Sequence, residues 1–170
     1  LGRFHPKKGA DLLLREIKNF PQLALVMAGP LSDTHPKFLD KLMSLSSPQV
    51  IWTDLLTGPA KWGALSLAQA FILPSHQENF GMGVAEALSV GTPALVSTQV
   101  ALSSDILANN AGFVAPDTAE GTRTLLEKFI SLTTEQKNNL RKNARACYEK
   151  NYLPQAVAQK LEALLSKIIL

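Results

Sequence analysis

The sequence predicts an α/β domain with a doubly wound parallel sheet. Short apolar runs, of the kind that form buried parallel strands, recur along the chain and alternate with segments of helical spacing. Glycine, proline and polar residues stand at most junctions, where the chain must turn. This alternation is typical of open parallel sheets, which bind their ligands at the carboxyl ends of the strands.

The apolar runs expected as strands lie at residues 23–28, 50–52, 70–73, 94–96 and 112–116. The expected helices lie at residues 10–19, 36–45, 60–68, 83–88, 103–109, 118–132, 135–150 and 154–170. In the first helix Leu13 and Ile17 share an apolar face, and in the fourth Val84 and Leu88 do so. The last helix begins at Pro154, a residue that suits the first helical turn.

Composition indicates one globular domain that covers residues 1–170. Hydrophobic residues make up 46% of the chain and charged residues 18%, and no segment approaches the 18 uninterrupted apolar residues of a membrane span. The single cysteine, Cys147, excludes an internal disulfide, and we expect its thiol to be buried and unreactive. One free thiol fits a reducing compartment, so we expect a cytoplasmic protein.

Charge and histidine spacing argue against two classes of ligand. A net charge of +3 with 6% aromatic residues does not supply the basic, aromatic-rich patch that nucleic-acid binding needs. The histidines, His5, His35 and His76, lack the spacing of metal ligands. We therefore expect neither nucleic acid nor a metal ion to bind. A small phosphate-bearing ligand or an anionic membrane surface is compatible with the charge.

A pair of carboxylates marks the chemical centre of the chain. Glu78 and Glu86 stand eight positions apart across the turn at Phe80-Gly81-Met82, which leads from an expected strand into a helix. The first amides of a helix lack internal partners and carry partial positive charge, so this turn can donate to an anion or to sugar oxygens. Helical side chains lean toward the N-terminus, which brings Glu86 to the same mouth. The alternative interpretation is that both glutamates are solvated surface charges.

A basic pair precedes the first helix. Arg3 and Lys8 lie five positions apart around a turn. A guanidinium binds phosphate in a bidentate manner and an ammonium adds a mobile charge, so the pair can clamp a diphosphate. The alternative is ordinary surface charge. A dinucleotide-binding motif is excluded, because Glu86 stands where the motif beginning at Gly81 needs a third small residue.

Together these residues resemble the donor-binding signature of the retaining glycosyltransferases of family 4, within group 1, which have the GT-B fold. The resemblance lies in Glu-x7-Glu with Phe-Gly inside it, in Pro-Ser before it, and in Glu-Ala-x3-Gly-x-Pro after it. Gly-Arg followed by Lys-Gly near the start matches the other half of the signature.

The resemblance implies a role for each matching residue. Glu78 would lie at the donor sugar, and Glu86 would bind the ribose hydroxyls. Arg3 and Lys8 would contact the donor diphosphate and, with Glu78, form the catalytic set. The turn amides that would hold the sugar and the diphosphate belong to Phe80, Gly81 and Met82.

The chain departs from the family pattern at two turns. Residues 30–31 replace a second glycine, so no phosphate contact is expected there. Thr53 stands where glycine is common, which weakens the expectation that residues 53–55 contact the nucleotide base. Trp52 and Trp62 can each stack on a base or belong to the core.

The resemblance runs from Gly2 to about Pro116 and implies the C-terminal, Rossmann-like half of a GT-B enzyme. The whole enzyme would transfer a sugar from a nucleoside diphosphate donor to an acceptor with retention of configuration, without a metal or other cofactor, as in polysaccharide biosynthesis. An N-terminal domain of the same protein would bind the acceptor, with peripheral association at the inner face of the membrane. The fragment alone should then be inactive. Two alternatives stay open: a non-catalytic nucleotide-sugar-binding or interaction module, and an epimerase or phosphorylase of the same architecture.

Two further expectations concern the ends of the sequence. In the family an apolar strand runs directly into Gly-Arg and lies at the centre of a sheet of order 3-2-1-4-5-6, and only Leu1 of it is present. We therefore expect a gap, a rearranged sheet or a filled slot between residues 23–28 and 70–73. The last helix has an apolar stripe that should lack a partner and promote self-association. The stripe consists of Ala158, Leu161, Leu164, Leu165, Ile168 and Ile169.

Overall fold

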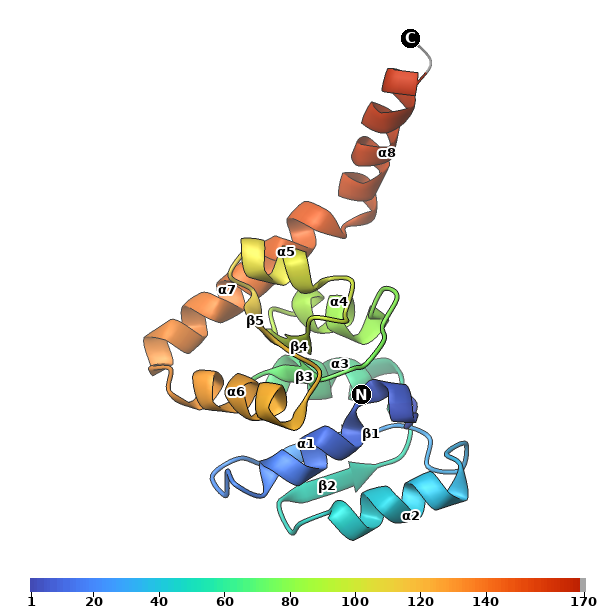
Figure 1. Ribbon diagram of the computed structural model, residues 1–170. Coiled ribbons are helices and arrows are strands. Elements are labelled where there is room, and N and C mark those ends of the chain that lie inside the picture. Colours follow the sequence, from blue (N-terminus) through green and yellow to red (C-terminus); the bar gives the residue numbers. More distant parts are fainter. Residues whose placement is uncertain (169–170) are drawn as a thin grey trace.

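The computed structural model describes residues 1–168, in which parallel strands alternate with helices (Figure 1). The strands are β1 (Leu25–Ala28), β2 (Val50–Thr53), β3 (Phe71–Leu73), β4 (Ala94–Ser97) and β5 (Gly112–Ala115). A 3-10 turn at Pro6–Lys8 precedes the helices α1 (Ala10–Ile17), α2 (Pro36–Leu45), α3 (Gly58–Leu67), α4 (Met82–Ser89), α5 (Ser103–Ala108), α6 (Ala119–Ile130), α7 (Thr134–Asn151) and α8 (Pro154–Ile168). The expected elements are all present, with ends that move by at most two residues.

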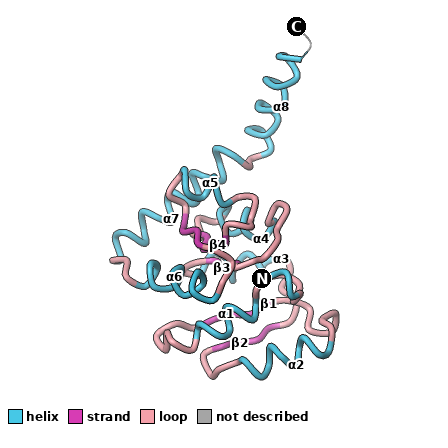
Figure 2. Tube along the Cα trace, viewed as in Figure 1, coloured by secondary structure: helices cyan, strands magenta, loops and turns pink. Residues whose placement is uncertain are grey.

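The sheet is divided into two parts, and a gap between residues 23–28 and 70–73 was one of the three outcomes expected from the sequence. β1 pairs in parallel with β2, and β3, β4 and β5 form a separate parallel set in that order. Figure 2 shows the two groups of strands in different parts of the molecule. Residues 1–2 lie between them, because the Gly2 amide donates to the Ala28 carbonyl at 2.8 Å while Leu1 packs against the core beside β3. Strand order is therefore that of a doubly wound sheet, interrupted between β1 and β3.

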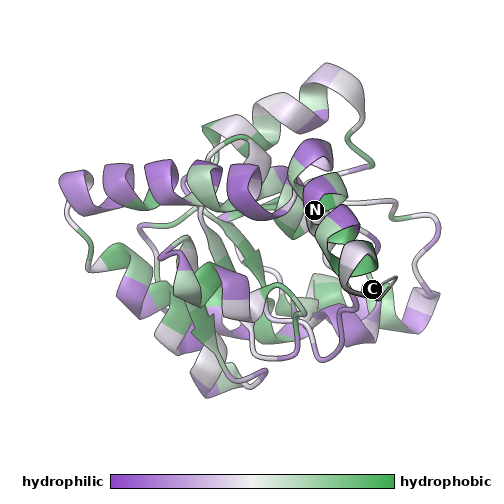
Figure 3. Cartoon of the chain, turned by 90° about the horizontal axis from the view of Figure 1, so that it is seen from above, coloured by the Kyte–Doolittle hydropathy of each residue, from purple (hydrophilic) through white to green (hydrophobic). Residues whose placement is uncertain are grey.

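Helices cover the strands from both faces. On one face α1, α2 and α6 pack together through buried side chains that include Leu14, Leu42 and Leu126. On the other face α4, α5 and α7 meet β3 and β4 through side chains such as Leu88 and Ile106. Figure 3 shows hydrophobic residues concentrated on the central strands. This two-sided burial explains why the strands read as continuous apolar runs.

Helix α8 extends away from the body of the molecule (Figure 1). Its apolar side chains Val157, Leu161, Leu164 and Leu165 are 48–58% exposed, so the stripe expected from the sequence lacks a cover among the described residues. The side chain of Ile168 and all of residues 169–170 lie outside the described part. No helix within residues 1–168 has both the length and the apolar character of a membrane span.

Candidate functional site

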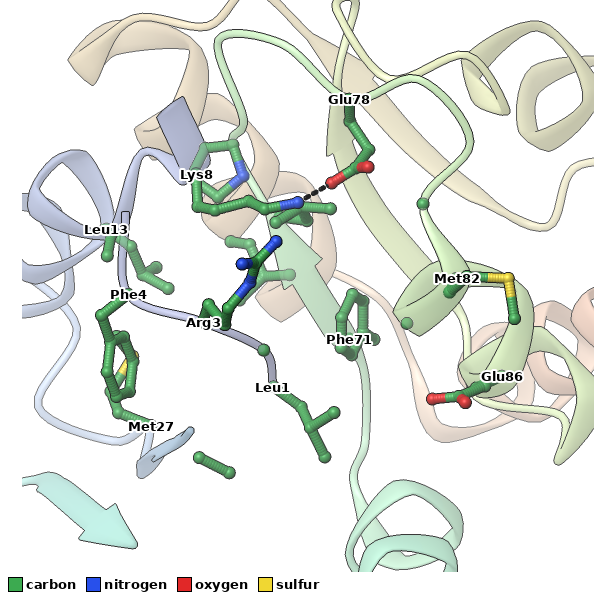
Figure 4. A pocket seen from close by; sticks show the side chains of 18 of the residues that line it. Leu1, Arg3, Phe4, Lys8, Leu13, Met27, Phe71, Glu78, Met82 and Glu86 are labelled. Atoms are coloured by element: carbon green, nitrogen blue, oxygen red, sulfur yellow. Dashed lines mark hydrogen bonds and ion pairs between the residues drawn. The ribbon is translucent and has the colours of Figure 1, made fainter. Parts of the chain in front are cut away.

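A cavity of about 480 Å³ opens at the carboxyl ends of β1 and β3. Its inner wall is apolar and includes Met27 of β1 and Phe71 of β3. The residues expected to contact the diphosphate, the sugar and the ribose all line this cavity, and most of them are labelled in Figure 4: Arg3, Lys8, Glu78, Phe80, Gly81, Met82 and Glu86. The fold therefore brings the basic turn and the glutamate motif to one place.

The basic turn is attached to the end of β3 by backbone contacts. The carbonyl of Lys7 accepts hydrogen bonds from the His76 amide at 2.8 Å and from Ser75 Oγ at 2.7 Å. Gly9 adopts a positive φ of 66°, and a Cβ at this position would overlap the Pro74 carbonyl. Only glycine allows the two segments to approach so closely.

This attachment places Lys8 beside Glu78. The Lys8 ammonium forms an ion pair with Glu78 Oε2, and both side chains are partly buried (Figure 4). The Arg3 side chain extends into the same space, and its guanidinium makes no hydrogen bond or ion pair to any residue in 1–168. A cation with unused donors therefore stands next to a neutralised pair at the mouth of the cavity.

The loop from Glu78 to Gly81 is held from its other side by the segment before α5. The Glu78 amide donates to the Gln99 carbonyl, and the Glu78 carbonyl accepts from the Ala101 amide, both at 3.1 Å. The two segments thus form a short parallel bridge at Glu78 and Val100. Glu78 is fixed in backbone as well as in side chain.

Gly81 turns the loop into α4. It has φ +87° and its carbonyl accepts from the amides of Val84 and Ala85, which starts the helix. Within the described residues the amides from Phe80 to Gly83 donate no hydrogen bond. These are the unpaired donors of a helix N-terminus, and they lie at the cavity. They can bind an anion or the oxygens of a polar ligand.

Glu86 lies one turn into α4 and faces a partner that the sequence did not reveal. Its Oε1 is 2.8 Å from Lys61 Nζ on α3, and both side chains are 22% exposed. The same ammonium lies 4.6 Å from the ring centroid of Trp62. Lys61 lies within the helix expected at residues 60–68, and its contact with Glu86 depends on how α3 packs against α4.

The residues considered for base contacts lie elsewhere. Trp52 is half-buried, meets Phe4 edge-on at 5.4 Å, and donates from its indole nitrogen to Ser46 Oγ at 3.0 Å. Neither Trp62 nor residues 53–55 line the cavity in the described part of the chain. Base contacts at residues 53–55 stay a prediction. No cluster of three or more His, Cys, Asp and Glu residues with the geometry of a metal site occurs within residues 1–168.

Known proteins resemble this chain in sequence and in fold. The family model for glycosyl transferases group 1 matches residues 1–147. The D-inositol 3-phosphate glycosyltransferase of Mycobacterium leprae is 30% identical over 103 residues, which are 57% of this chain and 24% of that enzyme. The chain therefore corresponds to a minor part of that relative.

Solved structures match nearly the whole chain. Sucrose-phosphate synthase from Thermosynechococcus elongatus superposes with a TM-score of 0.81 at 21% identity, over 99% of this chain and 44% of that one. HepE from Anabaena, determined in complex with UDP and glucose, gives 0.79 at 18% identity, over 98% and 47%. The fold is the Rossmann-like C-terminal domain of GT-B enzymes. The chain belongs to the glycosyl transferases of group 1.

Proposed function

We propose that residues 1–170 form the donor-binding domain of a retaining glycosyltransferase of family 4. One observation carries the proposal: a single cavity contains unpaired helix-terminal amides, two carboxylates and two cations. Amides and cations suit a diphosphate, and carboxylates suit sugar hydroxyls. A nucleoside diphosphate sugar presents both kinds of group in one molecule.

The diphosphate would lie between the basic turn and the start of α4. No residue in the described part of the chain occupies the guanidinium donors of Arg3, and Lys8 can shift from Glu78 to a phosphate oxygen. Together with the amides of the turn they would stabilise the charge that develops on the departing diphosphate. This role is electrostatic and assigns no step to a metal or other cofactor.

The two glutamates would bind hydroxyl groups. Each carboxylate accepts several hydrogen bonds, so Glu86 can keep its contact with Lys61 while it accepts from two ribose hydroxyls. Glu78, fixed by its bridge to Val100, would orient the donor sugar in the same way. The UDP of the HepE structure makes UDP and UDP-glucose the first ligands to test.

Transfer would need a second domain. The matched solved chains are more than twice as long as the part that this chain covers. We infer that an N-terminal domain of the same protein binds the acceptor and that residues 1–170 alone transfer no sugar. We also propose that the whole protein is cytoplasmic and associates peripherally with the inner face of the membrane.

Calorimetric titration with UDP and UDP-glucose tests the donor site through Glu86→Gln, which keeps the shape of the side chain. Loss of charge-assisted bonds worth about 1.5 to 3 kcal/mol should weaken binding roughly ten- to a hundredfold. The matched control is Glu135→Gln, an exposed residue in the first turn of α7, which should leave affinity unchanged.

Equal affinities of wild type and Glu86→Gln would remove the assigned role. Binding by the whole protein without transfer to any acceptor would favour the non-catalytic module. Transfer by residues 1–170 alone would contradict the inferred second domain.

A further inference from the structure

Tyr152 lies at the junction between α7 and α8 and contacts the loop from Glu78 to Gly81, the glutamate loop. It is the C-cap residue that follows α7, two positions before Pro154 begins α8. Its ring meets the ring of Phe80 at 5.9 Å between centroids and an interplanar angle of 89°, an edge-to-face contact. Phe80 belongs to the cavity wall, so a residue 72 positions away reaches the candidate site.

The hydroxyl of Tyr152 is anchored to a second element. It donates a hydrogen bond to Asp105 Oδ2 at the start of α5. Burial, followed by this hydrogen bond, raises the pKa of Tyr152 above its ordinary value, so the hydroxyl remains a donor at physiological pH. The ring is therefore held at both ends, by Phe80 and by Asp105.

Helix α5, which carries Asp105, is also connected to the glutamate loop. The segment just before α5 pairs with Glu78, through the bonds of Gln99 and Ala101. Tyr152 thus contacts Asp105 of α5 and Phe80, and both of these neighbours belong to segments that are connected to Glu78. Phe80 is 44% exposed, and the edge-to-face contact with Tyr152 covers part of its ring.

We propose that Tyr152 is a positioning residue for the glutamate loop, acting through Phe80 on the unpaired amides at the start of α4. The consequence for ligand affinity rests on the proposed function, because those amides are the groups assigned to the diphosphate and sugar. The effect on the loop itself requires no ligand.

Hydrogen exchange of the ligand-free, full-length protein tests the positioning directly. Tyr152→Leu removes the ring and the hydroxyl, and Tyr152→Phe removes the hydroxyl alone. The control is Lys142→Leu, an exposed position on the same helix α7. Exchange at the hydrogen-bonded amides that hold the loop, those of Glu78, Val84 and Ala101, is compared with exchange at β4 of the same variant, which corrects for any general loss of stability.

Tyr152→Leu should accelerate exchange at these three amides severalfold relative to β4, Tyr152→Phe should do so less, and Lys142→Leu should leave the ratio near that of wild type. An unchanged ratio in both Tyr152 variants would overturn the proposal. Should Tyr152→Leu fail to fold, Tyr152→Phe decides by the same ratio.

A double-mutant cycle with UDP-glucose tests the path through Phe80. Tyr152→Leu should weaken binding about two- to tenfold, the range of an aromatic pair, and should add nothing in a Phe80→Ala background. Additive losses would overturn the path through Phe80. Changed loop exchange without UDP-glucose binding by wild type would leave the positioning intact and refute the proposed function.

Discussion

Gly9 offers the sharpest test of how the two halves of the cavity are joined. Its φ of +66° costs an alanine about 1 to 2 kcal/mol, because the left-handed region crowds Cβ against the backbone. The added Cβ would also overlap the Pro74 carbonyl, and overpacking of this kind costs about 1 to 3 kcal/mol. Gly9→Ala should therefore lose about 2 to 5 kcal/mol, which lowers the melting temperature by roughly 4 to 20 °C for a domain of this size.

Two other glycines separate these contributions. Gly58 has φ +49° with no atom within 4 Å of an added Cβ, so Gly58→Ala should lose only about 1 to 2 kcal/mol. Gly63 lies inside α3 with ordinary helical φ and free space, so Gly63→Ala should gain about 0.5 to 1 kcal/mol. Thermal unfolding followed by circular dichroism measures all three variants.

The order of the three melting temperatures tests the close contact between Gly9 and Pro74. Gly63→Ala should lie above wild type, Gly58→Ala below it, and Gly9→Ala lowest. A Gly9→Ala protein as stable as Gly58→Ala would refute the close contact with Pro74. Because the displaced turn carries Lys8, Gly9→Ala should also weaken UDP binding, whereas Gly63→Ala should not.

The hydrogen bond from His76 lowers the pKa of Asp117 below its ordinary 3.8, with Nδ1 2.8 Å from Oδ2. A lowered pKa contributes stability that is present above about pH 3.8 and is lost as pH falls through the pKa of the folded state. His76→Ala should therefore raise the Asp117 pKa in an NMR titration. The unfolding free energies of His76→Ala and wild type should become equal in acid. On α8, Leu161→Glu with Leu164→Glu should abolish concentration-dependent self-association in sedimentation, because both side chains are more than half exposed. Gln159→Glu, on the same helix, should not; a wild type that stays monomeric at every concentration would contradict this expectation.

Much of the fold was predictable because its signals are local. Apolar runs and helical spacing placed the strands and helices, and proline and glycine placed the turns. Some ends moved by a residue or two: α7 begins after a capping box at Thr133, and α3 begins at Gly58, directly before Pro59 in its first turn. An interrupted sheet was one of the three outcomes that the resemblance at Gly2 and Arg3 implied, and the structure decided among them.

The residue types of the candidate site were equally visible, since a helix N-terminus between two glutamates is a contiguous pattern. The side chains that contact these residues from other elements could not be identified from the sequence. Lys61 reaches Glu86 across 25 positions and Tyr152 reaches Phe80 across 72, and neither pair has a local signature. Such contacts depend on how the helices pack against the sheet and each other, which is a property of the whole chain. The sequence determined which groups the cavity contains, and the tertiary structure decided which of them are paired and which remain free to bind a ligand.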